Sequence, residues 1–116
     1  MSNNVHASQV GYSNAGPSAF LTLVSDEDVV ILDVRTPAEF DGGHLQGALN
    51  IDVQDPAFAS RISRLNTDDS FALYCRAGRR SEVAAAFMVS QGFNAVTNST
   101  SGIAELGSAG AVIVTS

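Results

Sequence analysis

The sequence predicts an α/β domain with a central, mainly parallel sheet and helices on both faces. Short apolar runs alternate along the chain with stretches of helical periodicity, which is the pattern of strand–helix–strand units. The first clear run, Val29–Leu32, is apolar throughout, as expected for a strand buried on both of its faces. The length of 116 residues is that of one domain.

Helices are expected on either side of this strand. One begins at Pro17, and its apolar residues are Phe20, Leu21 and Val24. The other begins at Thr36–Glu39, which supplies a threonine N-cap, a proline at the first helical position and the glutamate of a capping box. The pair Gly42-Gly43 ends this helix, and Ala48–Ile51 is a weaker candidate for a strand.

The second half of the chain begins with the same alternation. Asp55-Pro56 is expected to open a helix that has Phe58, Ile62 and Leu65 on one face. The run Phe71–Tyr74 predicts the next strand, and Cys75 lies at its end.

A further helix and two short extended segments follow. Ser81-Glu82 is expected to begin the helix, Gly92 to close it, and its apolar face to carry Val83, Ala84, Phe87 and Met88. Ala95–Thr97 predicts a short strand. Ala111–Val114 looks extended, but its pairing partner cannot be deduced from the sequence.

Length and charge exclude several classes of protein. We expect a single domain over residues 1–116, with a core of about 17–106 and a peripheral N-terminal segment and C-terminal tail. No apolar run approaches the roughly 20 residues that span a bilayer, and the first residues do not resemble a signal peptide. A cytoplasmic protein is therefore expected. The net charge of −6 argues against nucleic acid or an anionic membrane as partner.

Positive charge is concentrated directly after the single cysteine. All six basic residues are arginines, and Arg76, Arg79 and Arg80 follow Cys75 within five residues. One cysteine forms no intramolecular disulfide, and with two histidines it does not make a usual zinc site. Ligands of open α/β sheets gather at the carboxyl ends of strands, where Cys75 is predicted to lie.

The loop after Cys75 has the composition of an anion cradle. Gly78 allows a tight turn. The successive backbone N–H groups of such a turn, together with the N-terminus of the following helix, form a concave site of positive potential. A thiolate at that point has a pKa below the ~8.5 of a free cysteine, and arginines dock oxyanions through paired hydrogen bonds. The expected chemistry is an anionic nucleophile that meets an anionic substrate. The alternative is an ordinary strand-to-helix turn with solvated arginines.

The segment Tyr74–Ser81 resembles the active-site loop of single-domain rhodaneses. Leu32–Phe40 and Gly43–Ile51 resemble the N-terminal signature of the same family, and the likeness extends from about Val29 to Leu106. The resemblance implies a five-stranded parallel sheet flanked by helices. It also implies a sulfurtransferase that carries sulfur as a cysteine persulfide and needs no metal or organic cofactor.

The resemblance assigns roles to the loop. Cys75 would attack the outer sulfur of thiosulfate, and the persulfide would pass its sulfur to cyanide in vitro, or to a thiol or protein cysteine in the cell. The persulfide would lie among the backbone N–H groups of Arg76, Ala77, Gly78, Arg79, Arg80 and Ser81. Arg76 and Arg80 would grip the substrate, and Arg79 would face outward toward a protein partner.

Other conspicuous residues are assigned structural roles. Asp33 and Arg35 flank the end of the first strand, where they would pair with one another or brace the active loop. Glu39 is explained by the capping box, His44 by a turn or packing, and Tyr74 by a partly buried strand position.

The segment Asn98–Leu106 departs from the family pattern. Ser101 replaces a glycine, and Leu106 stands near the usual tryptophan, so the pocket shape and preferred acceptor remain open. Cysteine phosphatases and arsenate reductases are one alternative, but their loops place five residues between cysteine and arginine, whereas four separate Cys75 from Arg80. An inert binding module and a sulfur carrier with a protein acceptor are the others.

Overall fold

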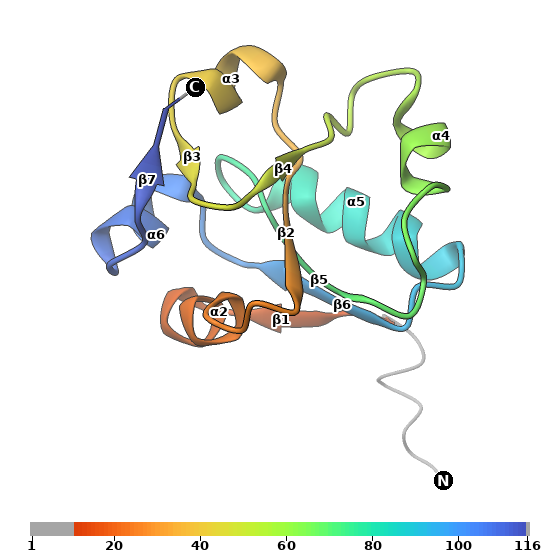
Figure 1. Cartoon of the computed structure of the whole chain (residues 1–116), viewed down its shortest axis with the longest axis horizontal. Helices are drawn as coiled ribbons and strands as arrows, with labels where there is room; N and C mark the ends of the chain where they lie inside the picture. Colours follow the sequence, from red (N-terminus) through yellow and green to blue (C-terminus); the bar gives the residue numbers. More distant parts are fainter. Residues whose placement is uncertain (1–10, 116) are drawn as a thin grey trace, which may run out of the picture.

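The computed structural model describes residues 11–115, so the N-terminal stretch in which no signal peptide is expected lies outside the described residues. Five parallel strands form the main sheet in the order β1-β6-β5-β2-β4, and β3 and β7 form a small antiparallel sheet (Figure 1). The predicted parallel α/β fold is thereby confirmed. In chain order the elements are β1 (Ser13–Ala15), α2 (Pro17–Val24), β2 (Val29–Asp33), α3 (Pro37–Asp41), β3 (His44–Leu45), β4 (Leu49–Asn50), α4 (Phe58–Ile62), β5 (Ser70–Tyr74), α5 (Arg79–Ser90), β6 (Ala95–Ser99), α6 (Ile103–Ser108) and β7 (Ile113–Val114).

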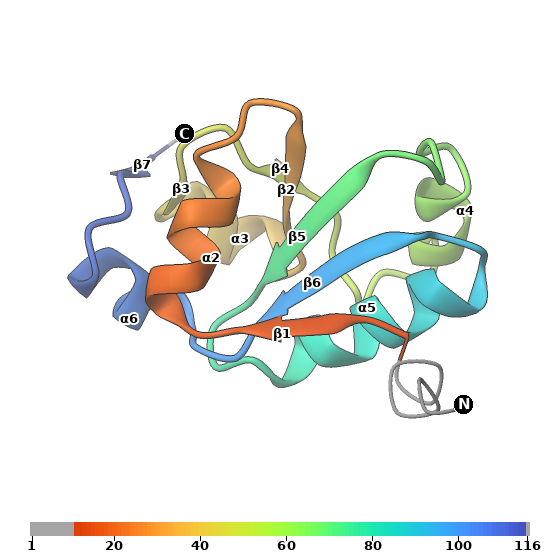
Figure 2. The same cartoon turned by 90° about the horizontal axis from the view of Figure 1, so that it is seen from below.

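Helices cover both faces of the sheet, as predicted. On one face α4 and α5 close a core that includes Leu32, Phe58 and Met88. On the other face α2 and α6 close a second core that includes Ile31 and Phe20. Consecutive residues of β2 thus enter opposite cores, which explains its unbroken apolar run. Figure 2 shows α2 and α5 on opposite sides of the strands.

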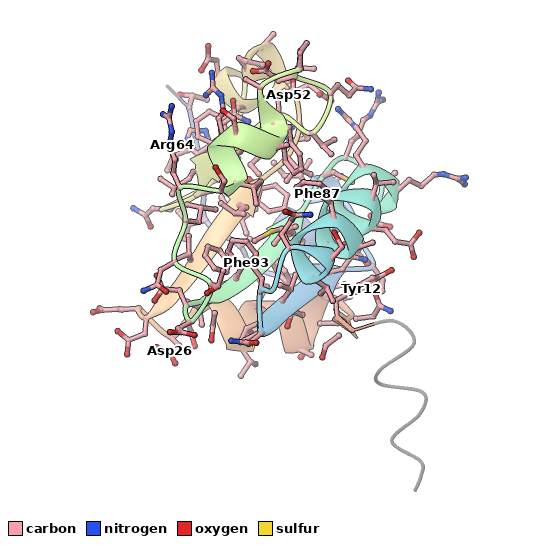
Figure 3. The ribbon with its side chains drawn as sticks, turned by 90° about the vertical axis from the view of Figure 1, so that its right-hand side faces the viewer. Tyr12, Asp26, Asp52, Arg64, Phe87 and Phe93 are labelled. Carbon is pink, nitrogen blue, oxygen red and sulfur yellow. The ribbon has the colours of Figure 1, made fainter. Side chains whose placement is uncertain are left out.

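The side covered by α4 and α5 is tightly joined by aromatic contacts. Phe87 of α5 lies 5.7 Å from Phe58 of α4 between ring centroids, and Phe71 of β5 lies 5.3 Å from Phe93. In Figure 3, α4 and α5 lie on the same side of the sheet, with Phe87 between them. These contacts join α5 to α4, and the segment that follows α5 to β5.

Two of the predicted helix starts are confirmed. α2 begins at Pro17. α3 begins at Pro37, where the Thr36 hydroxyl accepts a hydrogen bond from the Glu39 N–H and the Glu39 carboxylate accepts one from the Thr36 N–H.

Two other helix starts differ from the prediction. α4 begins at Phe58 and not at Asp55-Pro56, because the Asp55 carboxylate accepts from the Ala57 N–H in a turn that precedes the helix. Leu65 falls beyond this helix, although it packs against the core. α5 begins at Arg79, two residues before Ser81-Glu82.

The apolar face of α5 also differs from the prediction. Val83 is 63% exposed, whereas Ala84, Ala85 and Met88 are buried and Phe87 is half-buried. The start of α5 at Arg79 does not by itself explain why Val83 is exposed. The helix packs through its small residues, so the sheet faces the side of α5 that carries Ala84 and Ala85.

Two strands, β1 and β3, are absent from the prediction. β1 pairs with β6 at the edge of the main sheet. The C-terminal stretch pairs with β3, where Ile113 lies opposite Leu45 and Val114 opposite His44.

Within residues 11–115, no helix is long and apolar enough to cross a bilayer.

Candidate functional site

The site lies where three strands of the main sheet end. Cys75 directly follows β5, and the turn to α5 passes through Gly78, whose φ of 92° lies in the left-handed region that favours glycine. Asp33 ends β2, and Ser99 ends β6. In Figure 1 the β5–α5 turn lies between α6 and α5, below α3.

The sulfur of Cys75 is buried within its own loop. Cys75 is 1% exposed, the Gly78 N–H donates to Sγ at 3.0 Å, and the Ser81 hydroxyl oxygen lies 3.4 Å from Sγ. Burial raises the pKa of the Cys75 thiol. Hydrogen bonds from the Ser81 hydroxyl and from the backbone N–H groups of Ser81, Ala77 and Gly78 lower it by more, so the net pKa lies below the ordinary value. The thiolate, which is the nucleophilic form of cysteine, is therefore more stable here than in a free cysteine.

The segment after β6 supports the back of this loop. The Ile103 N–H donates to the Cys75 carbonyl at 3.1 Å. A Cβ on Gly102 would overlap the Arg76 carbonyl, and a Cβ on Gly78 would lie 2.9 Å from the Thr100 carbonyl oxygen. Backbone therefore packs directly on backbone, and a glycine is required at Gly102 by the close approach.

The departures from the family pattern in this segment are accommodated locally. Ser99 donates its hydroxyl to the Ser101 carbonyl at 2.7 Å, which stabilises the turn in which Ser101 stands. Leu106 is fully buried in the second core, together with Phe20 and Tyr74.

A buried polar network lies below the site. Arg35 donates through Nε to Asp33 Oδ1 at 3.0 Å and through Nη2 to Asp33 Oδ2 at 2.7 Å, so the expected pairing of these two residues is present. The same Nη2 donates to the Gly43 carbonyl at 2.6 Å. Tyr74 is fully buried and donates its hydroxyl to Asp33 Oδ2 at 2.7 Å, while accepting from the Leu45 N–H at 2.9 Å. This network joins β2 and β5 to the segment that forms β3.

Sequence reasoning missed the part that Tyr74 has in this network. Its side chain is directed to Asp33 and away from the sulfur, so it is a structural residue and more deeply buried than expected. His44 also has a packing role, because its ring stacks on Phe40 at 3.6 Å between centroids and its Nδ1 lies 2.8 Å from the Phe40 carbonyl oxygen.

The three loop arginines have different surroundings. Arg76 and Arg79 are exposed and form no ion pair with any residue between 11 and 115. Arg80 is half-buried, and its Nη1 and Nη2 donate to Glu39 Oε1 and Oε2 at 2.7 and 3.0 Å. The Arg80 guanidinium holds the pKa of Glu39 at about 2, well below its usual value. The partnership between Glu39 and Arg80 was not predicted.

A groove of about 660 Å³ adjoins the loop, between α3 and α6. Ala38 and Glu39 form one wall, Ile103 and Ala104 form the other, and Ile113 contributes from β7. Both walls contact the loop after Cys75, because Glu39 accepts from Arg80 and the Ile103 N–H donates to the Cys75 carbonyl.

Comparisons with known proteins agree on one family. The family model of the Rhodanese-like domain matches residues 16–109. The chain is 37% identical over 81 residues to a sulfurtransferase of Allochromatium vinosum, covering 70% of this chain and 74% of that protein. It is 39% identical over 79 residues to the putative sulfur carrier protein YrkF of Bacillus subtilis, covering 68% of this chain but only 42% of that protein.

Solved structures show the same fold. The chain superposes on a rhodanese-related protein from Thermoplasma volcanium with a TM-score of 0.78 and 25% identity, covering 90% of this chain and 100% of that one. A rhodanese from E. coli matches with a TM-score of 0.61 and 27% identity, over 76% of this chain and 99% of that one. A tRNA uridine(34) hydroxylase of Listeria monocytogenes is 36% identical over 95 residues, but the chain spans only 30% of its length.

Proposed function

Because the chain belongs to the rhodanese-like family, we propose that it is a sulfurtransferase that moves sulfane sulfur from a small anionic donor such as thiosulfate to a thiophilic acceptor through a persulfide on Cys75. One observation carries this proposal. The backbone N–H of Gly78 and the hydroxyl of Ser81 converge on the sulfur atom of Cys75, at 3.0 and 3.4 Å, in a loop that lowers the thiol pKa.

The proposed reaction consists of two displacements at sulfur. The Cys75 thiolate attacks the outer sulfur of thiosulfate, the S–S bond of thiosulfate breaks, and sulfite leaves with the bonding electron pair. An acceptor nucleophile then attacks the outer sulfur of the persulfide, and the Cys75 thiolate leaves as the original nucleophile. Cyanide gives thiocyanate, and a thiol gives a new persulfide. Each step exchanges one bond for another, so no external oxidant or reductant is consumed.

The loop residues have two tasks in this proposal. The N–H groups from Arg76 to Ser81 stabilise the negative charge of the thiolate and of the persulfide's outer sulfur. The exposed guanidinium of Arg76 meets the sulfonate oxygens of the donor, and that of Arg79 meets a protein partner. Asp33 and Arg35 do not contact the donor in this proposal. Their ion pair holds the end of β2, and Asp33 also binds Tyr74 at the end of β5, directly before the loop.

The loop length favours sulfur transfer over the phosphatase alternative. Four residues separate Cys75 from Arg80, and the guanidinium of Arg80 is directed to Glu39. The shorter cradle suits a single sulfur atom better than a tetrahedral oxyanion. The activity of the hydroxylase relatives is not carried over, because the chain matches only a minor part of their length.

A sulfur carrier that exchanges sulfur with another protein is the second candidate. The likeness to the putative sulfur carrier protein and the two exposed arginines at the loop favour it. Such a carrier would use the same persulfide but turn over thiosulfate slowly.

The cytoplasmic location stays a prediction from the sequence.

The test is thiocyanate formation from thiosulfate and cyanide, with Cys75→Ser as the matched control. We expect turnover in the wild type and none in the variant. After incubation with thiosulfate alone, the wild-type protein should gain the mass of one sulfur atom on Cys75. Absence of both turnover and mass gain would reject thiosulfate as donor. Mass gain on protein isolated from cells would then favour the carrier.

A further inference from the structure

The ion pair between Glu39 and Arg80 joins helix α3 to the first turn of α5. Both terminal nitrogens of Arg80 donate to the two carboxylate oxygens of Glu39, at 2.7 and 3.0 Å, in the two-pronged geometry that is strongest for this pair. Glu39 Oε1 also accepts from the N–H and the hydroxyl of Thr36, at 3.0 and 3.1 Å. The carboxylate is therefore held from both sides, and the side chains of the pair are only 25% and 28% exposed.

In this geometry the donor groups of Arg80 are already occupied and are not free to bind an anionic substrate. A guanidinium that grips a sulfonate offers its paired N–H groups to the sulfonate oxygens. Those groups of Arg80 face Glu39, and the positive charge of Arg80 is balanced by the adjacent carboxylate. Arg76 and Arg79 are exposed, without an ion pair to any described residue, and can offer theirs.

We propose that Arg80 is a positioning residue whose partner is Glu39 and not the sulfur donor: it holds the Glu39 carboxylate at the first turn of α5, and its main effect on the sulfur-transfer loop is that it cancels the charge of that carboxylate. Arg80 then acts on the loop and does not bind the sulfur donor. The inference rests on the proposed function for its kinetic readout, but a second readout, the reactivity of the Cys75 thiol, is independent of sulfur transfer.

The charge of Glu39 makes the proposal testable. Removing Arg80 alone leaves an unbalanced carboxylate next to a site that must hold a thiolate and receive an anionic donor. Much of the cost of breaking such a pair comes from the charge that is left behind. Removing both charges avoids that cost. Glutamine at position 39 preserves the capping box, since it keeps the oxygen that accepts from Thr36, so the α3 helix start is retained.

The experiment compares Arg80→Met, Glu39→Gln and the double variant by two measurements. The first is kcat/KM for thiosulfate. The second is the pH dependence of Cys75 alkylation by uncharged iodoacetamide. We expect Arg80→Met to lower kcat/KM by roughly five- to tenfold and to raise the apparent pKa of Cys75 by up to about one unit. The double variant should return to within about twofold of wild type in both measurements, because the unbalanced charge is gone.

Direct donor binding by Arg80 would give different results. The double variant would stay as weak as Arg80→Met in kcat/KM, and Glu39→Gln alone would lower KM, because a released arginine would be free for thiosulfate. Either result would overturn the proposal. Arg79→Met is the matched control, since it removes the same charge from a side chain without a described partner, and Glu39→Gln should not rescue it.

Two further controls separate the proposal from other failures. Arg80→Lys keeps the charge but not the two-pronged contact, so it should retain most of the thiol reactivity if charge balance is what matters. Thermal unfolding of every variant checks that the fold is intact. If the wild type did not turn over thiosulfate, the proposed donor would be rejected. The alkylation series would still decide the role of Arg80, because rescue of the Cys75 pKa in the double variant needs no donor.

Discussion

Gly102→Ala should disable the catalytic loop without touching the cysteine. Gly102 has φ −83° and ψ 179°, an extended conformation that alanine adopts without strain, so the effect of the substitution is steric. The added methyl would overlap the Arg76 carbonyl, and neither partner is a flexible side chain that can move aside. The loop from Cys75 to Gly78 must therefore shift away from the end of β6.

Overpacking of this kind costs about 1–3 kcal/mol of unfolding free energy. For a domain of this size, a loss of about 2 kcal/mol lowers Tm by roughly 10 °C. The shift also separates the Cys75 sulfur from the N–H of Gly78, now 3.0 Å away, so the thiol pKa should rise and thiocyanate formation should fall by at least about tenfold.

Gly16→Ala is the matched control for this prediction. Gly16 is also the N-cap of a helix, with φ −73° and ψ 178°, but apart from its chain neighbours no atom of residues 11–115 lies within 4 Å of an added Cβ. The cost of alanine at an N-cap is thus common to both variants, and the difference in Tm isolates the overlap with the loop. The assays are thermal unfolding and thiocyanate formation. If Gly102→Ala were as stable and as active as Gly16→Ala, the close approach at Arg76 would not support the loop.

Three further predictions concern the loop sulfur, the buried network and the ion pair. Ser81→Ala should raise the pKa of Cys75 toward its ordinary value, because the Ser81 hydroxyl is the leading cause that lowers it, so the alkylation profile should move to higher pH with an unchanged plateau. Tyr74→Phe should destabilise the fold by about 1–3 kcal/mol, measured by urea unfolding, because it removes the hydrogen bond from Tyr74 to Asp33 and leaves the buried Leu45 N–H without its acceptor. Because the pKa of Glu39 is lowered to about 2, ionised Glu39 stabilises the fold relative to Glu39→Gln. The difference in unfolding free energy between wild type and Glu39→Gln should be at its full value above pH 4.5, the ordinary pKa, and should decline as the pH falls toward 2. A difference that does not change with pH would contradict the contact between Glu39 and Arg80.

The parts of the fold that sequence predicted well are those with local signals. The start of α3 is determined by Thr36, Pro37 and Glu39, which lie within one turn of each other. The short strands β1, β3 and β7 contain two or three residues each and depend on partners far along the chain. Ala111–Val114 looks extended in the sequence, but no window of sequence around Ile113 could identify β3 as the partner of β7.

The same distinction applies to the site. The loop from Cys75 to Ser81 is continuous, so its residues and its position after a strand could be predicted. The contacts between Glu39 and Arg80 and between Asp33 and Tyr74 each join side chains 41 residues apart, and no spacing rule predicts them. Glu39 had a sufficient local explanation as a cap, which is why its second contact was missed.

The ends of strands β5, β6 and β2 contribute differently to the site. The end of β5 supplies the nucleophile and the N–H groups that stabilise it, through Cys75 and Gly78. The end of β6 supports that turn from behind through Gly102, and the end of β2 anchors the neighbouring backbone through Asp33. A loop supported on two sides by rigid backbone can hold its N–H groups on one atom without rearrangement, and this preorganisation is what lowers the energy of a thiolate and of the persulfide formed from it. Under the proposed sulfur transfer, the acceptor would be determined by what can approach an already rigid sulfur, and its selectivity would then lie in the exposed side chains of Arg76 and Arg79 and in the α3–α6 groove.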